Sequence, residues 1–200
     1  MKIRSKQLAC SICETRKEKR FCPAVHGRIC PQCCGEQREV TLDCPSDCVY
    51  LQQARQHEKQ QEHLLLGLSY ALAKSAGADH GIRDSDLIAA LTALARRYQM
   101  LASSGLHYES PMTNVSHQAI AVEIEKMVKE YRDAQQKHMG YVRVRDNDVL
   151  RALVFLLRMG YTRTSGRPRS RAFVDFLLAQ FPEQSSAIAA PQEASRIIVP

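Results

Sequence analysis

The most constraining feature of this sequence is the confinement of all eight cysteines to residues 10–48. They follow the pattern C-x2-C-x8-C-x7-C-x2-C-C-x9-C-x3-C, and His26 lies between the third and fourth cysteines. Two cysteines separated by two or three residues can direct two thiolates from one tight turn at a single tetrahedral ion. Eight thiolates would complete two four-ligand shells. The pattern therefore predicts a binuclear zinc module, with two Zn²⁺ ions as cofactors.

Two other uses of these cysteines compete with zinc. A disulfide framework requires an oxidising compartment, and the N-terminal MKIRSKQLAC lacks the apolar core of a signal peptide. Iron–sulfur proteins typically supply three close cysteines and a distant fourth. Residues 1–48 also hold few large apolar side chains. So short a segment needs cross-links, such as disulfides or a bound metal, to offset the conformational entropy that it loses on folding. Structural zinc contributes about 10–16 kcal/mol per site in small peptides, so we expect this segment to be unstructured without metal.

The cysteines and His26 group into four successive pairs: C10-S-I-C13, C22-P-A-V-H26, C30-P-Q-C33 and C44-P-S-D-C48. This order resembles the cross-brace zinc fingers of the MYND and HIT type. The resemblance implies that the first and third pairs hold one ion and the second and fourth pairs the other. It also implies that the module is an interaction domain. The resemblance is confined to the cysteine-rich segment and names no family for the rest of the chain.

Cys34 lies outside these pairs and is a further candidate ligand. If Cys34 binds metal, it replaces His26 and gives two all-cysteine sites; otherwise His26 completes the second site. The candidate metal ligands are Cys10, Cys13, Cys22, His26, Cys30, Cys33, Cys34, Cys44 and Cys48.

The sequence after the cysteines is helical throughout. Apolar side chains recur at three- and four-residue spacing, and the ends of the segments carry capping and stop residues. Predicted helices cover 49–77, 84–105, 116–140, 146–159 and 170–181. We therefore expect a mainly α protein. It would comprise an irregular cysteine-rich zinc module (1–48), a connecting helix (49–77), a helical domain (78–182) and a disordered tail (183–200). The helical domain would be a bundle of about five helices.

Two helical segments are similar to each other. Residues 84–96 align with residues 146–158 without a gap, and both place aspartates in the first turn, where the helix dipole favours negative charge. The similarity suggests a duplicated helical hairpin, 84–140 and 146–181. The alternative is two amphipathic helices that use the same capping chemistry.

The net charge of +7 is concentrated at both ends of the chain. Residues 1–40 carry nine Lys/Arg against four Asp/Glu, and residues 141–200 carry nine against five. Such basic segments suit an anionic partner, such as nucleic acid, or are solvated loops. The candidate contacts are Arg16, Lys17, Lys19, Arg20, Arg163, Arg167, Arg169 and Arg171.

The sequence contains no phosphate-binding glycine loop, nucleotide fingerprint or nucleophile elbow, so we favour a non-enzymatic function. We predict a zinc-dependent adaptor that binds a protein partner. One alternative is a nucleic-acid-associated regulator that uses the basic segments. A third is a redox sensor whose oxidised thiolates release zinc. The longest apolar stretch, 64–73, is too short to span a bilayer, so we expect a cytoplasmic protein without membrane association.

Overall fold

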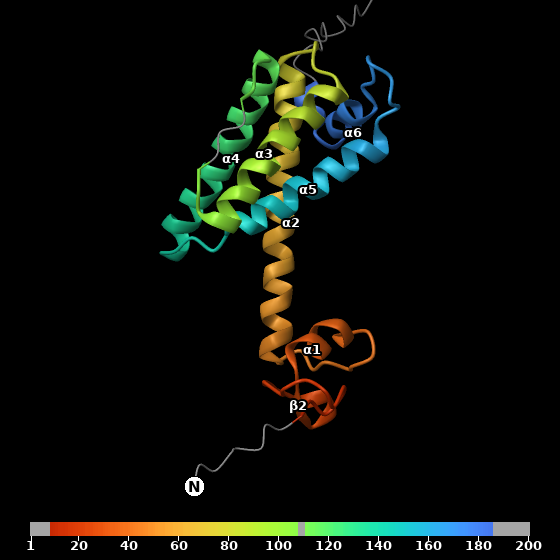
Figure 1. The fold of residues 1–200 in the computed structure, drawn as a ribbon, viewed down its shortest axis with the longest axis vertical. Helices are drawn as coiled ribbons and strands as arrows, with labels where there is room; N and C mark the ends of the chain where they lie inside the picture. Colours follow the sequence, from red (N-terminus) through yellow and green to blue (C-terminus); the bar gives the residue numbers. More distant parts are fainter. Residues whose placement is uncertain (1–8, 108–110, 186–200) are drawn as a thin grey trace, which may run out of the picture. The chain divides into compact units, whose positions relative to one another are not determined.

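The computed structural model describes residues 9–107 and 111–185 (Figure 1). The chain forms two compact units, Met1–Lys59 and Gln60–Pro200, which we call the cysteine-rich unit and the helical unit. The predicted fold class is confirmed: the protein is mainly helical, with a small cysteine-rich segment before the helices. Within the described ranges, no helix is long and apolar enough to cross a membrane.

The cysteine-rich unit contains a short hairpin and a short helix. Strand β1 (Arg20–Cys22) pairs antiparallel with β2 (Gly27–Ile29), and the 3-10 turn η1 (Pro23–Val25) connects them. His26 ends the turn with a left-handed φ of 47°. Helix α1 (Pro31–Gln37) follows β2. The sequence predicted only an irregular module, because three-residue strands are too short for an alternating pattern to show.

Thiols form most of the core of the cysteine-rich unit. The buried residues in this core are Cys10, Cys22, Ile29, Cys30, Cys33 and Cys34. Ile29 is the one large aliphatic side chain among them, and Ile12, Val25, Leu42 and Tyr50 pack against the cluster partly buried. The apolar part of this core is therefore small. That the segment is unstructured without metal stays a prediction.

Helix α2 begins in the cysteine-rich unit and ends in the helical unit. The helices of the rest of the chain are α2 (Val49–Ala78), α3 (Asp84–Ser104), α4 (Val115–Met139), α5 (Asp146–Arg163), α6 (Ala172–Gln180) and α7 (Pro182–Ser185). Gly105 and Gly140 follow α3 and α4 with φ of 69° and 76°, and each donates its N–H to a carbonyl of the last turn. Glycine adopts this conformation without strain, which explains why both predicted helix ends are correct.

The structure corrects two predicted boundaries near the C-terminal end. Helix α5 continues to Arg163, past the predicted end at Met159, because Gly160 lies buried in the helix rather than ending it. Helix α7 takes in residues 183–185, which the sequence assigned to a disordered tail. The rest of that predicted tail, 186–200, lies outside the described residues.

Helix α3 lies between α4 and α5 and packs against both (Figure 1). The core of the helical unit gathers apolar side chains from α2 to α6, and its fully buried members include Leu68, Leu91, Leu94, Leu153 and Phe173. This unit therefore has the continuous apolar core that the cysteine-rich unit lacks.

The N-termini of α3 and α5 share their capping chemistry. In α3 the Asp86 carboxylate accepts a hydrogen bond from the Arg83 N–H (2.8 Å), and in α5 Asp148 accepts from the Arg145 N–H (3.0 Å). This equivalence is compatible with a duplicated hairpin and with independent helices that begin in the same way. The duplication stays a prediction.

Asp84 is a buried carboxylate that joins α3 to α6. Its Oδ1 accepts hydrogen bonds from the N–H groups of Phe173 and Val174, both at 3.0 Å, and so caps α6. Its Oδ2 accepts from the Ser170 hydroxyl, and its N–H donates to the Ser170 carbonyl (3.0 Å). The Arg171 guanidinium donates to the His80 and Ile82 carbonyls before α3, which strengthens the same junction.

We expect Asp84→Ala to lower the free energy of unfolding by about 2–3 kcal/mol, because it leaves two buried N–H groups and a buried hydroxyl without their acceptor. Urea unfolding followed by far-UV circular dichroism measures this loss. Asp175→Ala is the matched control, since Asp175 lies in the first turn of α6 with its side chain 66% exposed. We expect the control to cost less than about 0.5 kcal/mol. Equal losses from the two variants would contradict the role of Asp84.

Candidate metal centre

Four of the predicted ligands converge on one point. The Sγ atoms of Cys10, Cys13, Cys30 and Cys33 all lie within 4.8 Å of one another. Four sulfurs that bind a tetrahedral zinc at about 2.3 Å lie about 3.8 Å apart. The cluster therefore has the dimensions of a site that could hold a single zinc. It combines the first and third predicted pairs.

The local fold explains how the two pairs meet. Cys10 and Cys13 lie on one tight turn, in which the Glu14 N–H donates to the Cys10 carbonyl (2.9 Å). The Ser11 N–H donates to the Arg28 carbonyl (3.0 Å) and fixes this turn beside β2. Strand β2 leads directly into Cys30, which caps the N-terminus of α1 and places Cys33 in its first turn. Pro31 starts the helix, where its missing N–H costs nothing.

Backbone N–H groups point at two of the sulfurs. The sulfur of Cys10 accepts hydrogen bonds from the Cys30 N–H (3.2 Å) and the Ile12 N–H (3.5 Å). The sulfur of Cys30 accepts from the Cys33 N–H (3.4 Å). Such bonds favour the thiolate, the form that binds metal, and hold each ligand in its orientation.

The same surroundings shift the thiol pKa values in the first pair. The pKa of Cys13 is lowered to about 5, chiefly because the Thr15 hydroxyl and the Thr15 and Arg16 N–H groups donate hydrogen bonds to its sulfur. Burial alone would raise the pKa of Cys10, but hydrogen bonds from backbone N–H groups outweigh it and lower that pKa. The surroundings of Cys10 and Cys13 thus favour the thiolate form of both residues.

Cys33 has the opposite tendency. Burial raises the pKa of Cys33 to about 12, and the neighbouring thiols of Cys30, Cys13 and Cys10 add to the rise. A fourth thiolate in this cluster is unfavourable without a compensating cation. A bound dication reverses this balance and deprotonates the thiol that it binds. The donor set therefore fits zinc, which thiolates bind strongly.

The other predicted ligands do not form a comparably tight group. Within the described ranges, no second set of three or more His, Cys, Asp or Glu side chains gathers as closely as the first. Cys22 and Cys34 are buried in the same core as the first cluster, Cys44 and Cys48 are half-buried, and His26 is exposed. All eight cysteines are free thiols. The structure thus brings together four of the nine predicted ligands.

The segments that carry Cys22 and Cys48 nevertheless lie side by side. They line one open pocket of about 370 Å³, whose walls are Phe21, Pro23, Pro45, Asp47, Cys48, Val49 and Tyr50. The Arg20 guanidinium also lies 4.6 Å from the centre of the Tyr50 ring. Sequence reasoning missed this pocket, because its walls come from residues far apart along the chain.

The predicted basic contacts of the cysteine-rich unit serve several purposes. The Arg16 guanidinium lies 3.9 Å from the Cys30 sulfur, and Arg20 stacks on Tyr50. Lys17 and Lys19 are exposed, and neither side chain has a hydrogen bond or ion pair within the part of the chain that the structure describes. Two of the four predicted contacts are therefore engaged inside their own unit.

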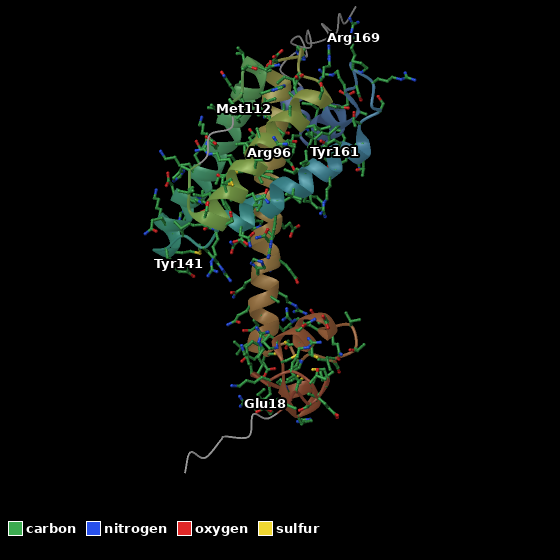
Figure 2. All side chains as sticks on the ribbon, viewed as in Figure 1. Glu18, Arg96, Met112, Tyr141, Tyr161 and Arg169 are labelled. Carbon is green, nitrogen blue, oxygen red and sulfur yellow. The ribbon has the colours of Figure 1, made fainter. Side chains whose placement is uncertain are left out.

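The predicted basic contacts near α6 divide in the same way. Arg163 lies 3.5 Å above the Phe176 ring, and Arg171 donates to two carbonyls at the start of α3. Arg167 and Arg169 are exposed on the loop between α5 and α6, where Figure 2 labels Arg169. Neither side chain has a hydrogen bond or ion pair with a described residue. Of the four predicted contacts near α6, Arg167 and Arg169 are thus the two available for an external anion.

Comparison of the chain with models of protein families, with curated proteins and with solved structures finds no significant match. The support for the metal centre is therefore the geometry of the cysteine cluster and its set of donor atoms.

We expect Cys33→Ser to remove one tightly bound zinc per chain and to unfold the cysteine-rich unit, because three ligands remain and little apolar core supports them. Elemental analysis of protein purified under reducing conditions measures the zinc. Hydrogen exchange measures the unfolding, which should be confined to the cysteine-rich unit and leave the helical unit protected. Gln32→Ala is the control, since Gln32 lies exposed between Cys30 and Cys33. A Cys33→Ser protein with the zinc content of the original chain would contradict the site.

Proposed function

We propose that the protein is a zinc-dependent interaction adaptor whose cysteine-rich unit presents an apolar pocket to a protein partner. The observation that carries this proposal is the exposure of large apolar side chains in a unit that buries so few. Phe21 is 55% exposed and Val49 is 59% exposed, and both line the 370 Å³ pocket. Exposed apolar surface of this kind, on a fixed framework, is typical of a protein-binding site.

The metal ligands and the pocket depend on the same turns. Pro23 and Pro45, which form pocket walls, directly follow the predicted ligands Cys22 and Cys44. Phe21 lies on β1, directly before Cys22, and pairs with Arg28 across the hairpin. Loss of metal would therefore release the turns that shape the pocket. This coupling makes the proposed interaction dependent on zinc.

We assign a second zinc to Cys22, Cys34, Cys44 and Cys48 as part of this proposal. The adjacency of the segments around Cys22 and Cys48 at the pocket supports it. Cys34 is the better eighth ligand, because it is buried in the same core as Cys22, whereas His26 is exposed at the end of η1.

We expect His26→Ala to keep two zinc ions per chain and Cys34→Ser to keep one, because only Cys34 supplies a ligand. Native mass spectrometry counts the ions on each variant. The reverse result, with one ion lost from His26→Ala and none from Cys34→Ser, would show that His26 and not Cys34 is the eighth metal ligand. A single zinc on the original chain would contradict the second site and leave the first unaffected.

We expect Phe21→Ala to abolish partner binding while zinc content stays unchanged, because the substitution removes the largest exposed apolar side chain of the pocket. A photo-crosslinking residue in place of Val49 captures the partner, and mass spectrometry quantifies it. Val40→Ala is the matched control, since Val40 is 78% exposed and does not line the pocket. Chelation should abolish capture in the same way as Phe21→Ala. Undiminished capture by the Phe21→Ala protein would contradict the pocket as the docking site.

A further inference from the structure

The helical unit contains an open groove of about 700 Å³. One face of α3 forms its floor, with Ser85, Ile88, Thr92 and Arg96 at successive turns. The end of α5 and the following loop form the facing wall, which includes Tyr161 and Arg167. Figure 2 labels Arg96 and Tyr161 on these two helices. All of these residues belong to the helical unit, and none of them is a predicted metal ligand.

The groove is long enough for an extended ligand. Ser85 and Arg96 are eleven positions apart on α3, which corresponds to about 16 Å at 1.5 Å per residue. The α5–α6 loop lies at the Ser85 end, because the Asp84 N–H donates to the Ser170 carbonyl (3.0 Å). Arg167 belongs to this loop, where its carbonyl accepts from the Ser170 N–H (3.0 Å). One arginine therefore stands near each end of the groove.

The groove carries two arginines, and no acidic residue lines it within the part of the chain that the structure describes. The two acids nearest to Ser85 are engaged elsewhere: Asp84 caps α6, and Asp86 pairs with the Arg83 N–H and with His117. Neither Arg96 nor Arg167 forms an ion pair within the described ranges, and both are exposed. Arg97, the next residue on α3, is by contrast paired with Glu125. The two groove arginines are thus available for an anion.

An aromatic ring, that of Tyr161, lines the groove together with the two arginines. Tyr161 is 60% exposed, and its neighbour Gly160 packs so closely against Ile88 that an added Cβ would lie 3.1 Å from the Ile88 Cγ1 atom. This contact fixes the end of α5 against the groove floor at Ile88. The floor there is apolar, with Ile88 and Ala89. A groove that combines apolar surface, an exposed ring and two arginines is complementary to a ligand that alternates rings with negative charges.

We propose that this groove binds a short segment of single-stranded nucleic acid, with phosphates on Arg96 and Arg167 and a base against Tyr161. Basic grooves with stacking aromatics bind single strands with little sequence preference, and few donors or acceptors here would distinguish one base from another. A length of three helical turns suits a run of nucleotides. An acidic polypeptide would also attract the arginines, but it offers no regular flat ring for Tyr161.

Fluorescence anisotropy of a labelled single-stranded oligonucleotide of about ten residues, titrated with the zinc-loaded full chain at several salt concentrations, tests the proposal. Arg96→Gln and Arg167→Gln should each weaken binding several-fold and reduce the slope of log K against log salt by about 0.7. Tyr161→Ala should weaken binding by at least about fivefold with an unchanged slope, because stacking carries no charge. Tyr161→Phe should bind normally, since it keeps the ring.

Arg151→Gln is the matched control, because Arg151 is exposed on α5, carries the same charge and does not line the groove. We expect it to change the affinity by less than about twofold. Loss of binding by Arg151→Gln equal to that by Arg96→Gln would overturn the proposal, as would the absence of binding by the original chain. Competition by polyglutamate as effective as by unlabelled oligonucleotide would assign the groove to acidic polypeptides instead. Phe21→Ala should leave this binding unchanged, which separates the test from that of the adaptor.

Discussion

The strongest constraint on the cysteine-rich unit is the close approach of four thiols that could share one ion. Cys10, Cys13, Cys30 and Cys33 place their sulfurs within 4.8 Å of one another, and burial opposes a charge on Cys33. Without a cation, this arrangement would concentrate charge or leave thiols protonated. A bound zinc would remove this conflict and stabilise a unit whose buried cluster consists mostly of thiols. The proposed partner surface would then depend on this cluster.

The helical unit is stabilised by different means. Its core is apolar and extends from α2 to α6, and one buried carboxylate, that of Asp84, joins α3 to α6. The Asp84 carboxylate is directed at Ser170 and the start of α6 and does not line the neighbouring groove, whose lining includes Arg96 and Arg167. The chain thus combines a cysteine cluster that could hold zinc with a helical unit that has a conventional apolar core.

The sequence predicted those features that depend on local chemistry. The C-x2-C spacings identified the four clustered cysteines, and Gly105 and Gly140 marked the ends of α3 and α4 correctly. It could not predict features made by distant residues. The capping of α6 by Asp84 joins positions about ninety residues apart, and the facing walls of the groove at Arg96 and Tyr161 come together only by packing of α3 against α5. Neither leaves a periodic pattern in the sequence.

The most direct test of the central claim is zinc K-edge X-ray absorption on protein purified under reducing conditions. The account predicts a first coordination shell of four sulfurs at about 2.3 Å, as expected for thiolate-bound tetrahedral zinc. A shell dominated by oxygen and nitrogen ligands would contradict it, because the metal would then lie outside the cysteine cluster.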